Sequence, residues 1–186
     1  MQHNVYLDEI RAWSKHALEK PLEYFNNLPP CPYAEKAWED IRVDCVIKDT
    51  DNKQVLYTTV SQFPNNLDIV LIVDKKYEKS AKDFHDYLDA MNVAISRGMF
   101  IDKDIWVMGF HPDDEASEYV DDANFCHLTE ESYAIIFVQR LTKLHESADK
   151  LKKRGYYKIY SKEYNADAIF KLRETLYRRL KDGNET

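Results

Sequence analysis

Hydrophobic residues spaced three and four positions apart predict the helices of this chain. Such stripes predict an amphipathic helix over Leu7–Glu19 and a long helix with its buried face over Tyr77–Ile95, which ends at Gly98. Two further stripes, over Tyr133–Leu151 and Ile169–Leu180, predict helices in the last third of the chain. Because charged residues fill the other side of each stripe, we expect these helices to cover a sheet with one face and meet solvent with the other.

Shorter apolar segments predict strands. Ile41–Ile47 alternates apolar and polar residues, as a half-buried strand does, whereas Leu67–Val73 is nearly continuous aliphatic, as a central strand is. Ile105–Phe110 is a further aliphatic segment of strand length. The polar turn before Val55–Val60 favours a hairpin with the preceding strand, and Tyr156–Tyr160 suits an edge strand.

The order of these elements predicts the fold class. A strand, a helix and a strand follow one another over residues 67–110, which is the order of a βαβ unit with two parallel strands. The length of 186 residues favours one domain over two. We therefore expect a single α/β (α+β) domain over residues 1–186, with a small mixed sheet and flanking helices.

Composition and charge narrow the partners and the compartment. The net charge of −7 makes nucleic acid an unlikely partner, because contacts to phosphate need clustered cations. The basic residues within 140–181 suit solvated helix faces, with a basic face for an acidic partner or nucleic acid as the alternative. No apolar run approaches the roughly 18 residues of a membrane span. Three cysteines are too few for a disulfide framework, so we expect a cytoplasmic protein. A small-molecule ligand stays open, and the oligomeric state is not predicted.

Cys31 is the first residue that suits a chemical role. It precedes Pro32, which fits the first position of a helix. The unpaired N–H groups and the positive dipole end at a helix start favour the thiolate form of a cysteine. Cys31 is therefore a candidate nucleophile, redox centre or metal ligand. The alternative is that Cys31 is a small packed residue at a proline-rich helix entry.

A second candidate group is His111 with the carboxylates that follow it. His111, Asp113 and Asp114 leave the carboxyl end of a predicted strand, where open α/β sheets bind ligands. An imidazole beside carboxylates suits a general base with an orienting acid, or a zinc or iron site. In the metal interpretation, the ligands are His111, Asp114 and the later His127. A solvated acidic loop, with His111 ending the strand, is the alternative.

Several short motifs occur in a fixed order along the chain. They are Trp13, then Leu28-Pro29-Pro30-Cys31-Pro32-Tyr33-Ala34, then Phe110-His111-Pro112-Asp113, and finally Ala123-Asn124-Phe125. With them, the span from Trp13 to about Leu151 resembles an uncharacterised bacterial family, a domain of unknown function. That family pairs an early tryptophan with Leu-Asn-Leu-Cys-Pro-Phe-Ala and later shows Phe-His-Pro-Asp. Its Asn-Arg-Ser-Pro-Tyr-Pro motif is missing here. The resemblance implies no activity, but it singles out Cys31 and His111.

Two hypotheses of function follow. In the first, the chain is an enzyme whose catalytic residues Cys31, His111 and Asp113 surround one pocket at the carboxyl edge of the sheet. In the second, it is a non-catalytic interaction or regulatory protein that contacts a partner through its acidic loop, its tyrosines and its basic helices. The hypotheses differ in whether Cys31 and His111 meet at a concave pocket.

Overall fold

A four-stranded mixed sheet forms the centre of the molecule. The computed structural model describes residues 2–78, 80–100, 103–114, 132–157 and 166–183. The strand order is β1-β2-β4-β3. The strands are β1 (Val43–Lys48), β2 (Ile69–Asp74), β3 (Ile105–Phe110) and β4 (Ala134–Arg140). β1 and β2 are parallel, and β4 pairs antiparallel with both β2 and β3. The predicted α/β class with a small mixed sheet is confirmed.

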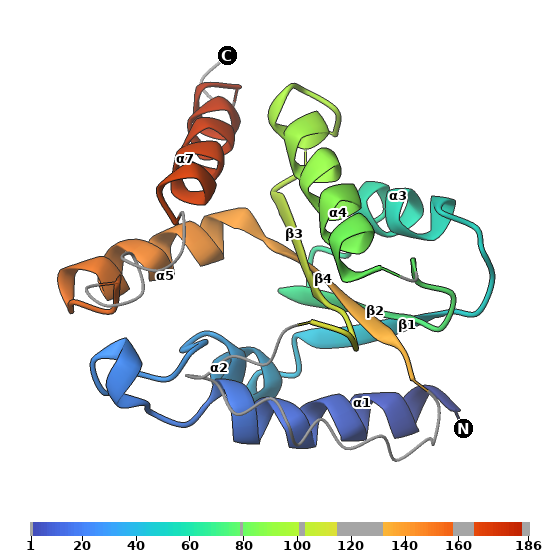
Figure 1. The fold of residues 1–186 in the computed structure, drawn as a ribbon. Coiled ribbons are helices and arrows are strands. Elements are labelled where there is room, and N and C mark those ends of the chain that lie inside the picture. The colour runs from blue at the N-terminus through green and yellow to red at the C-terminus, as the bar shows by residue number, and fades with distance from the viewer. Residues whose placement is uncertain (1, 79, 101–102, 115–131, 158–165, 184–186) are drawn as a thin grey trace.

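Helices cover both faces of this sheet (Figure 1). One face carries α1 (Gln2–Trp13), its π-helical continuation η1 (Ser14–Leu18) and α2 (Ala34–Glu39). The other carries α3 (Gln54–Ser61) and α4 (Ala81–Ser96). A short 3-10 turn, η2 (Glu23–Phe25), lies between η1 and α2. α5 (Leu141–Lys153) continues from β4, and α7 (Ala166–Gly183) packs against both α4 and α5.

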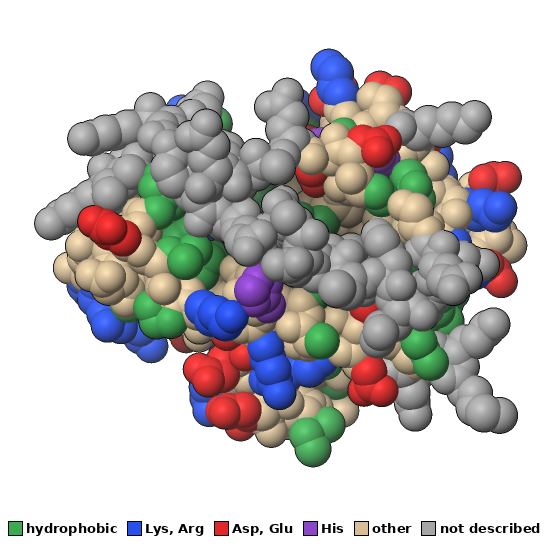
Figure 2. Space-filling view, turned by 60° about the horizontal axis from the view of Figure 1, so that its bottom comes forward, with side chains coloured by type: hydrophobic (Ala, Val, Ile, Leu, Met, Phe, Trp, Pro, Cys, Tyr) green, Lys and Arg blue, Asp and Glu red, His purple; other side chains and the backbone are tan. Residues whose placement is uncertain are grey.

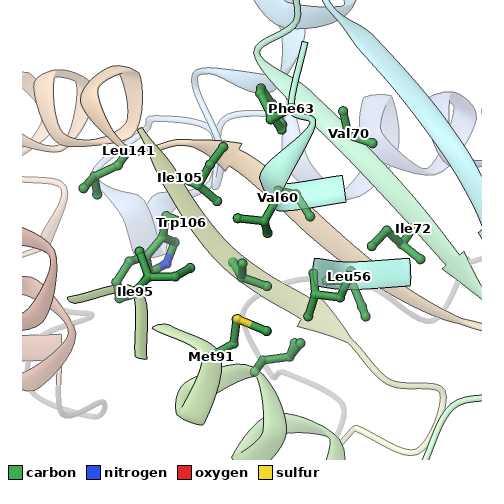
Figure 3. Packing of buried hydrophobic residues seen from close by; sticks show 14 of the residues in the cluster. Leu56, Val60, Phe63, Val70, Ile72, Met91, Ile95, Ile105, Trp106 and Leu141 are labelled. Carbon is green, nitrogen blue, oxygen red and sulfur yellow. The ribbon is translucent and has the colours of Figure 1, made fainter. Parts of the chain in front are cut away.

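The face towards α3 and α4 holds a hydrophobic core (Figure 3). Val70 and Ile72 of β2 pack there with Leu56 and Val60 of α3 and with Met91 of α4. All five side chains are at most 4% exposed. Burying a side chain of this size contributes roughly 1.5–3 kcal/mol relative to leaving it in water. This core therefore fixes α3 and α4 to the sheet.

On the opposite face, the apolar stripe of α1 packs against the same strands. Tyr6, Ile10 and Trp13 recur at helical spacing and are at most 4% exposed. They belong to one cluster with Leu71 and Val73, the side chains that β2 turns to this face. Because β2 is buried on both faces, its sequence is continuously aliphatic, which is why the pattern identified a central strand.

Two of the sequence-based predictions are wrong in type. Residues 55–60 lie in helix α3 and do not form a hairpin strand, because Leu56 and Val60, four positions apart, bury the same side of one helix. The single helix predicted from the Tyr133–Leu151 stripe is strand β4 followed directly by α5. The apolar run Ala134–Val138 fills the gap between β2 and β3, where only an extended segment pairs with both neighbours.

The predicted βαβ unit is present in a modified form. β2 and β3 point the same way and are joined by α4, but β4 lies between them, so they are not hydrogen-bonded to each other. For the predicted edge strand 156–160, Tyr156 lies in the turn after α5, and 158–160 fall outside the described residues.

The surface carries both signs of charge. Viewed from the α1 side, acidic and basic side chains are interspersed (Figure 2). Within the described ranges, none of the helices has the length and apolar content needed to traverse a bilayer.

Candidate functional site

A cavity of about 530 Å³ lies on the face of the sheet that α1 and α2 cover. The sheet contributes Leu71, Phe110 and Phe137 to the wall, and α1 contributes Trp13. α5 closes another side, with Ala148 among the residues it supplies. The wall is therefore mostly apolar and rich in aromatic rings. It is built from elements that are far apart in the sequence.

The segment before α2 forms one wall because it is tied down on both sides. Asn26 adopts a left-handed backbone with a φ of 58°, which asparagine tolerates better than most residues, so the chain can reverse there. The backbone N–H of Cys31 donates to Leu18 O at 2.9 Å. The Tyr156 hydroxyl donates to Pro30 O from the turn that follows α5. These bonds hold Cys31 at the cavity in one position.

The electrostatics of Cys31 differ from the prediction of a stabilised thiolate. Burial raises the pKa of the Cys31 thiol above its ordinary value and outweighs the backbone N–H groups of Tyr33 and Ala34, which act to lower it. Helix α2 has only six residues, so its end provides a weak dipole. Cys31 lines the cavity as a partly exposed residue whose thiol is buried. At neutral pH it is protonated.

His111 follows β3, as predicted, but both of its ring nitrogens are engaged. Nε2 lies 2.8 Å from Glu78 O, and the backbone N–H of Asp113 donates to Nδ1 at 3.0 Å. A carbonyl accepts only, so these bonds assign the ring proton to Nε2. The side chain is fully buried and its ring packs edge-on against Tyr77. His111 therefore joins the end of β3 to the β2–α4 loop, and the lone pair of its Nδ1 is already in use.

The two carboxylates after His111 have different surroundings. The side chain of Asp113 is 75% exposed, and its Oδ2 lies 4.0 Å from His111 Nδ1. Asp114 is more buried: its Oδ2 accepts from the backbone N–H of His111 at 2.7 Å, and its Oδ1 lies 2.7 Å from His85 Nε2 on α4. Burial acts to raise the pKa of Asp114, but the bonds from His85 and His111 hold it below its ordinary value. The bond to Asp114 raises the pKa of His85 above its ordinary value, although burial acts to lower it.

The structure brings together some of the predicted residues and separates others. Cys31 and Asp114 line the same cavity, whereas the described wall does not include His111. A thiol–imidazole pair is thus not formed within the described part of the wall. In the ranges that the structure covers, no three His, Cys, Asp or Glu side chains gather as a metal site would require. His127 falls outside those ranges, so the zinc or iron site stays a prediction.

The carboxyl ends of β1 and β2 carry a second, smaller group of polar residues. Lys48 and Asp74 face each other across the strands, and Lys48 Nζ donates to Asp74 Oδ1 at 2.6 Å and to Lys76 O at 2.8 Å. They line a cavity of about 220 Å³. Since Lys48 holds Lys76 O and His111 holds Glu78 O, the two side chains together fix the loop that leads into α4.

Gln139 is a polar cavity residue that sequence reasoning missed. It lies on β4, lines the cavity and is 4% exposed. Its Nε2 has no hydrogen-bond partner in the described part of the chain. In a predicted helix, a glutamine at this position reads as a surface residue. Gln139 lies two residues after Phe137, and alternate residues of a strand share a face. Recognising β4 as a strand would therefore have placed Gln139 on the same buried face as Phe137.

Comparison of the chain with protein-family models, curated proteins and solved structures finds no match. The resemblance to the bacterial family therefore stays a prediction that rests on the motifs alone.

Proposed function

We propose that the chain binds a small, largely apolar molecule in the cavity beside Cys31. The observation that carries the proposal is a cavity of about 530 Å³ whose wall is mostly apolar and aromatic. Ligand pockets in proteins typically span about 300–1,000 Å³ and are lined by hydrophobic side chains with few polar groups. A molecule of matching shape buries its own apolar surface there and gains dispersion contacts along the wall.

The chemistry of the wall favours binding over catalysis by Cys31. A catalytic cysteine acts as a thiolate and needs a base within reach. Burial raises the pKa of Cys31, and both nitrogens of His111 are engaged elsewhere. The enzyme hypothesis keeps one support, which is that Cys31 and Asp114 share a cavity. Binding of a small molecule, without catalysis by Cys31, is thus the function that this site supports best.

The proposal also includes the absence of nucleic acid as a partner and a cytoplasmic location. The net charge of −7 and the mixed charges on the α1 side (Figure 2) support a partner other than nucleic acid. The small number of cysteines supports a cytoplasmic location.

The proposal is tested by titrating the protein with Nile red, a neutral apolar dye. Trp13 and Trp38 both lie in the cavity wall, so a bound dye should quench their emission by energy transfer. We expect saturable binding. Ala148→Phe fills the space from the α5 side and should weaken binding at least tenfold, because Ala148 is a buried lining residue.

Ala90→Phe is the matched control, since Ala90 is exposed on α4, away from this cavity. It should leave the dye affinity unchanged. If Ala148→Phe fails to fold, Ser147→Phe provides the same test from a less buried lining position. Equal affinity of the wild type and the folded filling variants would reject the cavity as the binding site.

A further inference from the structure

Gln139 places one polar group in an otherwise apolar part of the sheet. Its register partners on the neighbouring strands are Ile69 and Trp106, and Phe137 precedes it on the same face of β4. The side chain lines the cavity with 4% exposure, and its Nε2 donates to no described group. A buried donor without an acceptor is costly, and folded proteins keep few of them. The unmatched amide therefore needs an explanation.

Two other polar residues of the wall, Ser14 and Asp114, already have hydrogen-bond partners. The Ser14 hydroxyl donates to Glu19 and accepts from Trp38 Nε1, at 2.6 and 3.2 Å. Asp114 is paired with His85 at 2.7 Å. Gln139 differs from Ser14 and Asp114 in that its Nε2, a hydrogen-bond donor, has no acceptor among the described residues.

Building on the proposed function, we propose that the ligand carries a neutral oxygen acceptor, such as a ketone or ester carbonyl, that accepts a hydrogen bond from Gln139 Nε2. The apolar body of the ligand fills the aromatic part of the cavity, and the carbonyl lies over β4. Gln139 is then a specificity-determining residue. It favours a carbonyl compound over a hydrocarbon of the same shape, since only the carbonyl satisfies the buried donor.

A neutral acceptor fits the wall better than a carboxylate does. The donor that lacks a partner is an uncharged amide, whereas taking a carboxylate out of water requires a compensating cation. The wall contains one such cation among its described residues, Arg173. Its guanidinium is already engaged in cation–π contacts with the rings of Trp106 and Phe170, at 5.1 and 5.8 Å from their centroids. Asp114, which also lines the cavity, repels a second negative charge.

The test compares three probes in the full chain: 2-acetylnaphthalene, the hydrocarbon of the same shape 2-isopropenylnaphthalene, and 2-naphthoate. Each is titrated by displacement of Nile red from the wild type and from Gln139→Leu. In the wild type we expect the ketone to bind roughly five- to tenfold more tightly than the hydrocarbon, as one net hydrogen bond provides. Gln139→Leu should abolish this preference and should raise the Tm of the unliganded protein, because it removes the unmatched donor.

Gln62→Leu is the matched control, since Gln62 is exposed and does not belong to the described wall of this cavity. It should keep the ketone preference. If Gln139→Leu does not fold, Gln139→Met replaces it. Equal binding of ketone and hydrocarbon in the wild type overturns the role of Gln139 while leaving the proposed function intact. Tighter binding of naphthoate than of the ketone overturns the neutral class. If neither Nile red nor any of the three probes binds, both proposals fail.

Discussion

The side-chain amide of Asn92 binds the backbone of Val107 through both of its polar atoms. Nδ2 donates to Val107 O at 2.7 Å, and Oδ1 accepts from Val107 N at 3.0 Å. Val107 lies on β3, which is an edge strand of the sheet, and Asn92 is a 2% exposed residue of α4. The amide therefore takes the place of the missing neighbouring strand at this point and joins α4 to the sheet edge.

Replacing Asn92 by leucine should destabilise the fold strongly. The leucine leaves the N–H and C=O of Val107 buried without partners, at a cost of roughly 1–3 kcal/mol for each group. We expect the free energy of unfolding, measured by urea denaturation, to fall by about 2–6 kcal/mol. Asp89→Leu, at an exposed position on the same helix, should change it by less than about 0.5 kcal/mol. Similar stabilities for the two variants would show that the Asn92 bonds contribute nothing.

Ile41 occupies a backbone conformation that β-branched residues avoid. Its φ is 54°, and the bonds from Ile41 N to Trp38 O and from Arg42 N to Ala37 O end helix α2 in the way that usually places glycine at this position. The side chain is 84% exposed, so it gains little from burial. The left-handed conformation costs an L-residue roughly 1–2 kcal/mol.

Ile41→Gly should therefore stabilise the protein by about 1 kcal/mol, after the larger unfolded-state entropy of glycine is deducted. Thermal unfolding followed by circular dichroism measures the gain. Ile41→Val keeps the branched Cβ and should leave the Tm nearly unchanged. A lower Tm for Ile41→Gly would mean that the exposed isoleucine has a packing role that its position does not suggest.

Cys31 should react as a buried thiol and not as an activated one. Because burial raises its pKa, the midpoint of its alkylation rate against pH should lie above the ordinary value of 9.0. Iodoacetamide labelling followed by peptide mass spectrometry gives the profile. Cys45 serves as an internal reference, since burial raises its pKa to about 12 and its side chain is 3% exposed. A Cys31 midpoint below 9.0 would restore the thiolate hypothesis and with it the enzyme.

The His85–Asp114 pair should make stability depend on pH. The pKa of His85 is raised, so its contribution is fully present below 6.5 and is lost as pH rises through the folded-state value. The pKa of Asp114 is lowered, so its contribution is present above 3.8 and is lost as pH falls through the folded-state value. The pair therefore stabilises the fold most between about pH 4 and 6.5.

His85→Gln isolates this contribution, because Asp114 keeps its bond from the backbone of His111. The loss of stability relative to the wild type should be larger at pH 5.5 than at pH 9, and smaller in high salt, since the side chains are 42% and 25% exposed. Equal losses at both pH values would indicate a packing effect without electrostatics.

His111 should prove to be a structural residue. His111→Ala removes the bonds to Glu78 O and from Asp113 N and leaves a buried void, so we expect a loss of about 2–4 kcal/mol in the free energy of unfolding. Asp113→Ala, at a 75% exposed side chain, should change it by less than about 0.5 kcal/mol. Wild-type stability for His111→Ala, together with metal content in the purified wild type, would return His111 to the metal hypothesis.

Sequence patterns predicted those elements whose burial is regular. Ile105–Phe110 was placed at its observed bounds because it is short, aliphatic and followed by polar residues. β4 was misassigned because no glycine or proline separates Arg140 from Leu141, and because the apolar residues on either side of this boundary can be joined by helical spacing. The β-branched residues of α3 favour a strand by local preference, and packing against the sheet overrides that preference.

The candidate site was predicted only in part, because it depends on packing between distant parts of the chain. Cys31 was identified because proline and a helix start flank it, and it does line a cavity. Its pKa shift has the opposite sign because burial depends on Tyr156 and α5, which lie more than 100 residues further along the chain. Gln139 could not be identified without the strand assignment of β4. Long-range packing, which no local pattern encodes, determines both.

The position of β4 also constrains how the chain is made. β4 pairs with both β2 and β3, yet it is the last of the four strands to leave the ribosome. At about 5–20 residues per second, the 30 residues from Phe110 to Arg140 take roughly 1.5–6 s to synthesise. During that interval β2 and β3 have been made and each lacks its β4 partner, so both present open hydrogen-bonding edges to other nascent chains. Until β4 emerges, these two edges are therefore the part of the sheet that is open to pairing with another chain.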